Sequence, residues 1–343
     1  MSYESEHVLP ESVRPADVRA FVSLLGYKRG ATKTYEGVRF EPYFWFDDAD
    51  YRSWTGVELT LVIAPSKALT VDTRTPIARS YYDLAYQNHT IAALKRRFGG
   101  NFTTDEGHGR YLRPDAGPPP PPASGCHIAF ARFGFLLIKA IHYHEARTFA
   151  QPSTPYYKDF TLIRELDPRT LANNTLVPYL VAALEDYFKS TFIALLRYSP
   201  RQESFFKGIR LQGEQLLAVS RGSSSVEEQL VETLPFQRIT AICRHFDAID
   251  PRLDLAGTLR KPYRKRRLSL FDLLEKLVVT RHNLIHKAVV DLQLTDTRVL
   301  DLIYDLDAAI TRVYRRITTY HHWHFERTWF LGRRRKEPRA PTP

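Results

Sequence analysis

The residues best suited to chemistry in this chain lie together at positions 281–286, which read Arg-His-Asn-Leu-Ile-His. A guanidinium group can hold a phosphate through paired hydrogen bonds, and an imidazole can donate or accept a proton near neutral pH. Arg281, His282 and His286 therefore combine phosphate recognition with proton transfer. Such a set can bind a phosphodiester, polarise it and move protons around it.

A helix should position these side chains, because the stretch from Leu268 to Val290 has strong helical periodicity. At about 100° per residue, Arg281 falls near the middle of an apolar stripe. His282 and His286 lie on its edge, one turn apart and facing the same way. The stripe consists of Leu270, Leu274, Leu277, Val278, Leu284, Ile285 and Ala288. A guanidinium in such a stripe is costly unless it is paired.

A second expected helix, from Asn174 to Arg197, offers a partner for that charge. Glu185 lies within its apolar stripe, which consists of Val177, Val181, Phe188, Phe192 and Leu196. Two opposite charges, each out of place on a helix that should pack against the other, predict one buried ion pair. We therefore expect Glu185 and Arg281 to lie within hydrogen-bonding distance.

The motif resembles the R-x4-6-H signature of the HEPN superfamily of small helical domains. Many active members carry a polar residue directly after the Arg, as His282 does here, and members also tend to carry an acidic residue on an early helix, as Glu185 would be. The resemblance covers roughly residues 168–325 and is specific only at Arg281, His282 and His286. It implies a helical bundle with metal-independent endoribonuclease activity and no cofactor.

The resemblance also implies roles for the motif residues. His286 would act as general base or acid on the ribose 2′-hydroxyl, giving a 2′,3′-cyclic phosphate and a 5′-hydroxyl, and His282 would assist as second proton carrier. Arg281 would stabilise charge on the phosphate or orient the site through Glu185, and the intervening Asn283 would support it. Family members commonly dimerise with the motifs of two subunits lining one cleft, so a homodimer is expected.

Two other interpretations of the bundle stay open. A non-catalytic HEPN-like module for binding or dimerisation would keep Glu185 and Arg281 as structure and would have no use for His286. A nucleic-acid-binding regulator would instead depend on the basic segment that precedes the motif helix. This segment supplies six cations in eight residues, which are Arg260, Lys261, Arg264, Lys265, Arg266 and Arg267. With Tyr263 among them, they could hold an RNA backbone, or they could form a solvated loop.

The composition favours a soluble intracellular protein with an acidic partner. The chain has 343 residues, enough for two domains, and a net charge of +11. Its two cysteines, Cys126 and Cys243, form neither a metal motif nor a disulfide framework. No signal pattern occurs, and the apolar run from His127 to His144 is too short and too interrupted by charge to span a bilayer. We expect a cytoplasmic location and no membrane.

The fold class expected is an α+β N-terminal domain followed by an all-α, four-to-five-helix bundle. Residues 1–150 would form a sensor or regulatory domain that receives a trigger, with strands at Val38–Phe46 and Val57–Ala64 and a helix at Pro76–Phe98. Residues 128–147 could be a helix, which we favour, or two strands, and the proline run at 118–122 would be an exposed loop. The expected later regions are a connector at 151–167, a bundle at 168–325 and a basic disordered tail at 326–343.

Within the bundle, helices are expected near Asn174–Arg197, Ser225–Phe246, Leu268–Val290 and Thr295–Tyr320. An added large domain beside a HEPN-like bundle is similar to bacterial abortive-infection and phage-defence proteins, which suggests a toxin-like effector with a phage-derived trigger.

Three further groups of residues could do chemistry, but each fits a simpler interpretation. His142, His144 and Glu145, and likewise His321, His322 and His324, could bind a metal, but neither spacing matches a known ligand motif. We interpret them as surface histidines and expect no metal site. The loop from Asp105 to Arg110 could line a pocket, but its glycines favour a turn.

Overall fold

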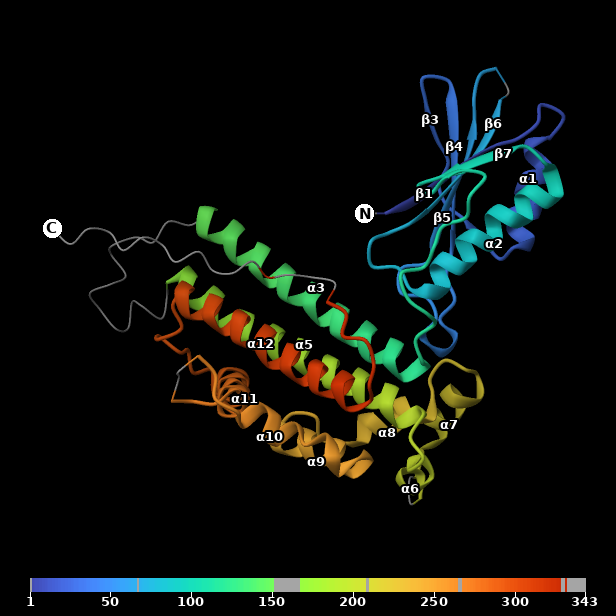
Figure 1. Cartoon of the computed structure of the whole chain (residues 1–343). Coiled ribbons are helices and arrows are strands. Elements are labelled where there is room, and N and C mark those ends of the chain that lie inside the picture. The colour runs from blue at the N-terminus through green and yellow to red at the C-terminus, as the bar shows by residue number, and fades with distance from the viewer. Residues whose placement is uncertain are drawn as a thin grey trace. The chain divides into compact units, whose positions relative to one another are not determined.

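The structure is a computed structural model that describes residues 2–66, 68–150, 167–207, 210–264, 267–327 and 331, with the backbone alone at 148–150. The chain divides into two compact units, Met1–Ser124 and Gly125–Pro343. Figure 1 shows strands and helices in the first unit and helices throughout the second. The α+β organisation expected from the sequence is thus confirmed at the level of fold class.

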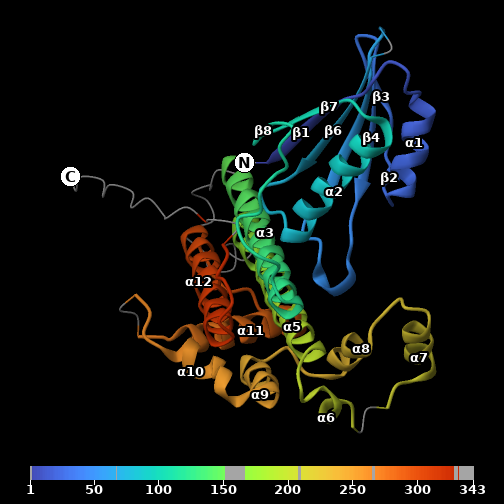
Figure 2. The ribbon, with the colours of Figure 1, turned by 45° about the vertical axis from the view of Figure 1, so that its right-hand side comes forward.

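The first unit is an antiparallel sheet with helices on one face (Figure 2). The strands follow the order β2-β4-β5-β6-β1-β7-β8, and β3 pairs with β4. Their bounds are β1 Tyr3–Val8, β2 Lys28–Arg29, β3 Lys33–Tyr35, β4 Val38–Trp45, β5 Val57–Ile63, β6 Leu69–Thr75, β7 Asn101–Thr104 and β8 Gly107–His108. The helices are α1 Pro15–Leu24 and α2 Tyr81–Phe98, with a short 3-10 turn, η1, at Ala49–Tyr51.

The core of this unit lies between the helices and alternate residues of the strands. Val57, Leu59 and Leu61 of β5 are fully buried there, together with Val18 and Val22 of α1. The residues between them, such as Glu58 and Thr60, point to the opposite face, as strand geometry requires. Helix α2 begins at Ser80, whose hydroxyl accepts a bond from Asp83 N in a capping box. One face of the sheet therefore carries no helix from this unit.

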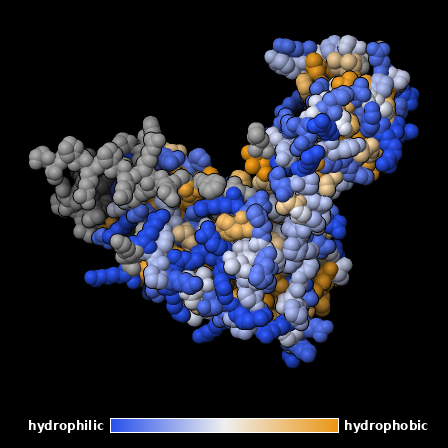
Figure 3. All heavy atoms as spheres, viewed as in Figure 1, coloured by the Kyte–Doolittle hydropathy of each residue, from blue (hydrophilic) through white to orange (hydrophobic). Residues whose placement is uncertain are grey.

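The second unit is a bundle around two long helices, α5 Pro168–Arg197 and α12 Asp296–Tyr320, with α3 Pro121–Ala150 beside them. Helix α11, Leu270–Lys287, packs against both α5 and α12. The shorter helices are α6 Gln202–Phe206, α7 Gly213–Ser220, α8 Val226–Thr233, α9 Ile239–Ile249, η3 Pro251–Leu253 and α10 Leu255–Arg260. Figure 3 shows that the visible face of this unit is mostly hydrophilic, with scattered apolar residues.

Helix α3 belongs to the bundle, so the expected border at residue 150 is wrong. The favoured helical interpretation of residues 128–147 is confirmed, but their apolar side chains pack on the second unit. Phe130 stacks on Tyr314 of α12 at 4.2 Å between ring centroids, and Phe133 contacts Tyr187 of α5. The border at Ser124 instead follows the proline run, which the sequence analysis interpreted as a loop rather than a border.

By length and composition alone, residues Pro121–Arg147 of α3 could cross a membrane. However, 56% of their most apolar stretch is buried inside the protein. Core helices of globular domains have the same properties, so this is weak evidence for a span.

Most of the other predicted elements are confirmed, with one break. The helix expected at Ser225–Phe246 is divided into α8 and α9, because Pro235 interrupts it and cannot continue a helix. The predicted connector at 151–167 lies outside the described residues except for Asp167, the N-cap of α5. The predicted basic tail lies outside them too, apart from Glu326, Arg327 and Leu331.

Candidate functional site

Helix α11, which carries the Arg-His motif, is fixed at both ends by local hydrogen bonds. Ser269 caps its start, where its hydroxyl accepts from Asp272 N at 3.2 Å. The helix ends at Ala288, which has a left-handed backbone with φ 53°, and the carbonyl of Asn283 accepts the bond from Ala288 N. This bond involves the backbone of Asn283 and not its side chain, and it closes the helix that holds the motif.

Neighbouring helices hold α11 in place. On α9, Thr240 donates from its backbone N and its hydroxyl to Glu275 of α11, at 2.8 and 2.9 Å. The loop after α11 is held by Asn174 of α5, fully buried, whose side chain accepts from Asp291 N at 2.8 Å and donates to Asp291 O at 3.1 Å. The helix is therefore anchored on two sides, and its motif has a defined position in the bundle.

The two histidines of the motif lie together on the exposed side of α11. Their rings are 4.6 Å apart between centroids, and both side chains are exposed. His286 and Lys287 occupy the last helical turn, where cations complement the helix dipole. The prediction that His282 and His286 face the same way is confirmed, and both are open to a ligand.

Arg281 is half-buried, and its guanidinium makes no hydrogen bond or ion pair within the part of the chain that the structure describes. The predicted bond with Glu185 is wrong: no ion pair within 4.0 Å joins them. The two charges still influence each other, because burial raises the pKa of Glu185 while Arg281 and Lys189 act in the opposite direction. Glu185 therefore lies within electrostatic range of Arg281 but beyond contact.

The Glu185 carboxylate also lacks a hydrogen-bond donor. Its Oε1 atom is buried and accepts no hydrogen bond within the described residues. Nearby Lys189 bonds instead to Glu232 of α8 at 3.0 Å. A half-buried guanidinium and a desolvated carboxylate, each without its own partner, are costly in a folded protein. Such cost is typical of sites that complete their hydrogen bonds with a ligand.

The apolar stripe predicted for α11 is buried only in its first half. Leu270, Leu274 and Leu277 are buried, whereas Ile285 is 53% exposed and Ala288 is exposed. Beyond Arg281 the stripe is only partly buried, since Leu284 is half-buried and the residues after it are exposed. The second half of α11 thus presents apolar residues and the two histidines together on the surface of this chain.

The basic segment lies at the other end of α11. Arg260, Lys261, Arg264 and Arg267 are exposed, while Lys265 and Arg266 lie outside the described residues. Arg312 of α12 fixes the segment by donating to the carbonyls of Lys261 and Pro262, at 2.8 and 3.2 Å. From Leu270 to His286 the helix rises about 24 Å. The structure therefore does not bring the basic segment and the histidines into one site.

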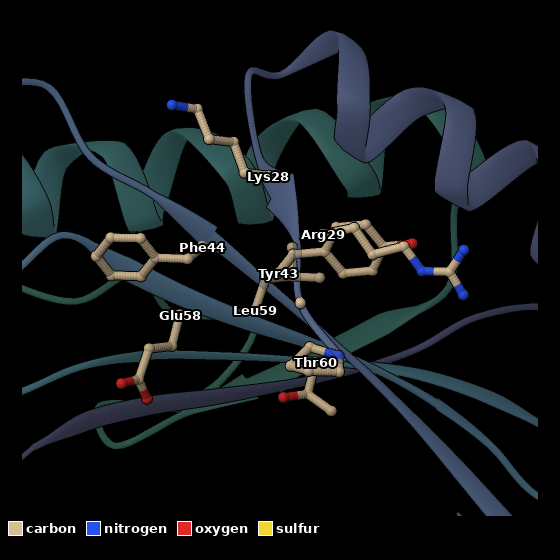
Figure 4. Close-up of a pocket in the computed structure, with 9 residues that line it drawn as sticks. Lys28, Arg29, Tyr43, Phe44, Glu58, Leu59 and Thr60 are labelled. Carbon is tan, nitrogen blue, oxygen red and sulfur yellow. The ribbon is translucent and has the colours of Figure 1, made fainter. Parts of the chain in front are cut away.

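The first unit contains two hollows at its sheet. One, of about 410 Å³, involves residues of β2, β4 and β5 (Figure 4), where Phe44 and its register partner Glu58 extend to the same side. The other, of about 560 Å³, lies over the helix-free face and is lined by Glu4, Glu6 and Asp72 among others. Burial, with Glu6 and Glu4 nearby, raises the pKa of Asp72 to about 6.

The remaining histidine clusters do not assemble into a site. His144 is buried, which contradicts its interpretation as a surface residue, and lies 3.9 Å from Asp296. His142 is exposed, and His321 stacks on Trp323 with centroids 4.4 Å apart. Among the described residues, no group of three or more His, Cys, Asp or Glu side chains is placed to hold a metal ion. The Asp105–Arg110 segment contains the expected turn, at Asp105 and Glu106 between β7 and β8, and its residues Gly107 and His108 form β8.

Sequence reasoning missed a buried Arg-His-carboxylate cluster elsewhere in the bundle. Arg147 of α3 donates to Asp296 of α12 at 2.8 Å, and Arg169 of α5 lies 3.4 Å from the same carboxylate. His144 and Asn173 complete the cluster. The spacing of His144 and Arg147 on one helix face was visible in the sequence, but nothing there indicated a partner more than a hundred residues away.

Comparison with known proteins gives no relative: no family model, curated protein or solved structure matches this chain.

Proposed function

We propose that this protein is a metal-independent endoribonuclease of HEPN type, with its site at Arg281, His282 and His286. The observation that carries the proposal is the open state of the motif. Arg281 has no polar partner among the described residues, and two exposed imidazoles lie 4.6 Å apart beside it. A purely structural Arg-His pair would be expected to be bonded internally.

The reaction would begin at the ribose 2′-hydroxyl of the RNA. One histidine removes its proton while the 2′-oxygen attacks the adjacent phosphorus, and the bond from phosphorus to the 5′-oxygen breaks. The other histidine donates a proton to that leaving oxygen. Arg281 stabilises the negative charge that builds on the phosphate. The products are a 2′,3′-cyclic phosphate and a 5′-hydroxyl, and His286 and His282 share the acid and base roles.

A homodimer is part of the proposal, supported by the surface around the histidines. Val279 and Ile285 of α11 and Val289 just after it are each more than half exposed. Apolar side chains grouped beside polar functional ones are typical of surfaces that a partner covers. A second copy placed there would bring a second Arg-His set to the same cleft.

The first unit would act as the sensor or regulatory part, with a phage-derived trigger at one of its two hollows, and the whole protein as a toxin-like effector of anti-phage defence in the cytoplasm. The exposed cations of the basic segment, Arg260, Lys261, Arg264 and Arg267, would contact the RNA backbone. Such contact should weaken as salt concentration rises.

The deciding experiment compares RNA cleavage by the purified wild type, His286→Ala and His142→Ala, with EDTA present. His142 is an exposed helical histidine of the same bundle, so it controls for the loss of an imidazole. We expect His286→Ala to reduce the cleavage rate at least about 100-fold, and His142→Ala to leave it unchanged. Circular dichroism should show the wild-type helix content in both variants.

The alternatives give different results. If the bundle is a non-catalytic HEPN-like module, neither the wild type nor either variant cleaves RNA. In that case, any toxicity of the wild type to the cells that express it is not relieved by His286→Ala. A nucleic-acid-binding regulator retards RNA in a salt-sensitive way without turnover. Cleavage that EDTA abolishes would contradict the proposed metal-independent chemistry.

A further inference from the structure

Three arginines of the first unit converge on one buried carboxylate. Glu41 of β4 is fully buried, and Arg19 of α1 donates to both of its carboxylate oxygens, each at 2.8 Å. Arg29 of β2 and Arg39 of β4 lie 3.1 and 2.8 Å from the same carboxylate. Within the described residues, no other carboxylate lies at ion-pair distance from these guanidinium groups. The cluster therefore holds three positive charges against one negative charge.

The strand register brings the two outer arginines to Glu41. Arg39 precedes Glu41 by two residues on β4, so both side chains lie on the same face of the sheet. Arg29 is paired with Tyr43, which follows Glu41 by two residues and faces the same way. After Arg29, residues 30–32 lie opposite only two residues of β4, as in a β-bulge. Bulges of this kind often re-aim side chains beside functional sites.

The need to neutralise Glu41 explains one of these arginines but not all three. Arg19 alone gives the carboxylate a two-pronged partner, and this bond lowers the pKa of Glu41 against the effect of burial. Arg29 and Arg39 are 45% and 47% exposed at their side chains. Each guanidinium has five N–H donors. Beyond Glu41, the only bond that either makes in the described part of the chain is from Arg29 to Thr32 Oγ1, at 3.3 Å.

Most donors of the two outer arginines are therefore left for solvent or a ligand. Three like charges held this close together also repel each other. A bound anion would use the free donors and relieve the repulsion, and Glu41 holds the guanidinium groups in place before the anion arrives. Groups that are already fixed lose less freedom on binding.

We propose that Arg19, Arg29 and Arg39 together bind a phosphate monoester. Guanidinium groups match phosphate oxygens with paired hydrogen bonds. The surplus of positive charge suits a monoester, which is close to a dianion at pH 7, better than a backbone diester with its single charge. The monoester could belong to a free nucleotide or to the phosphorylated end of an RNA strand, since both present the same group. This binding does not depend on cleavage by the second unit.

The test measures binding to the full-length His286→Ala protein by calorimetry. The probes are inorganic phosphate, 5′-AMP, adenosine, and a tetranucleotide of adenosine with and without a 5′-phosphate. We expect saturable binding of the probes that carry a terminal or free phosphate, and none of adenosine. Arg29→Gln and Arg39→Gln should each weaken this binding about tenfold or more, because each removes a charged partner of the phosphate. Both leave the bonds from Arg19 to Glu41 in place.

Arg52→Gln is the matched control and should have no effect. Arg52 belongs to the same unit, is 48% exposed at its side chain and is paired with Asp47. Arg39→Lys keeps the charge but loses the planar fork, so its affinity should lie between those of Arg39→Gln and the parent. Circular dichroism should show the parent's helix content in every variant.

The probes also separate the two sources of the phosphate. Binding of 5′-AMP supports a free monoester, and binding of the phosphorylated tetranucleotide alone supports the end of an RNA strand. Three results would overturn the proposal: no saturable binding of any probe, equal binding by Arg29→Gln, Arg39→Gln and the parent, or no gain from the terminal phosphate in either pair of probes. Because His286→Ala is used throughout, each of these results is independent of whether the wild type cleaves RNA.

Discussion

Two Arg-His-carboxylate groups occur in the same bundle, and they differ in whether the arginine and the carboxylate of the group are bonded to each other. In the cluster at α3 and α12, Arg147 is 7% exposed and donates to Asp296 at 2.8 Å, with Arg169 close to the same carboxylate. At α11, Arg281 and Glu185 lie beyond ion-pair distance, and His282 and His286 are exposed. The residue types are similar, but only the first group is closed, in the sense that its arginine and its carboxylate form an ion pair. Even there, Arg147 Nε and Asn173 Oδ1 are buried and have no hydrogen bond within the described residues.

Whether the arginine and the carboxylate are bonded to each other distinguishes a structural role from a functional one better than the residue types do. A closed group pairs its opposite charges within the fold, so its loss should mainly reduce stability. An open group leaves donors and acceptors for a ligand, so its loss should mainly reduce binding or activity. The same comparison makes the Glu185 carboxylate informative, because a desolvated acid without a bonded partner should oppose folding rather than support it.

The largest expected effect on stability is that of Arg147→Ala. It removes the closest cation from Asp296, although Arg169 remains nearby, so we expect a loss of about 3 kcal/mol in the free energy of unfolding. Urea unfolding followed by circular dichroism would measure it. An exposed arginine of the same bundle, changed by Arg244→Ala, should have almost no effect. A loss below about 1 kcal/mol would show that the closed cluster contributes little, and the comparison would fail.

Arg281→Ala should give the opposite result. With no internal bond to lose, it should reduce the free energy of unfolding by less than about 1 kcal/mol while lowering RNA cleavage at least about 100-fold. The same urea titration and the cleavage assay measure the two effects. If Arg281→Ala unfolds as easily as Arg147→Ala, then Arg281 is a structural residue, as the predicted ion pair had implied.

Helical periodicity in the sequence predicts one part of the site, namely which side of a helix each residue faces. It places Glu185 and Arg281 on facing sides of two packed helices, and their mutual electrostatic influence agrees with that. It gives the direction of a side chain around a helix axis but not the relative height of two helices. The predicted hydrogen bond depends on that height, and it is not formed. The assignment of α3 was wrong for a different reason, because its apolar side chains could have packed on either unit.

The first unit shows a related limit. Strands β4 and β5 were predictable because β-branched and aromatic residues dominate them. Strands β1 and β6 were missed, because their outward residues, among them Glu4, Glu6 and Asp72, make the sequence look like a polar loop. Alternation was present, but its buried members are partly polar themselves: Ser5 and Thr73 are buried and bonded to each other at 2.6 Å.

The smallest expected effect, with the opposite sign, is that of Glu185→Gln. Burial raises the pKa of Glu185 in the folded protein above its ordinary value of 4.5. The folded state therefore holds the proton more tightly than the unfolded state, and stability falls as pH rises through the interval between the two pKa values. Glutamine carries no charge at any pH, so the variant should escape this loss.

We expect its melting temperature to exceed that of the wild type by at most a few degrees at pH 7, and to match it at pH 4, where the wild-type carboxyl is protonated. Asp296→Asn is the matched change in the closed cluster and should lower the melting temperature at pH 7. If Glu185→Gln lowers it as well, Glu185 stabilises the fold as Asp296 does, and the distinction between an open and a closed group is lost.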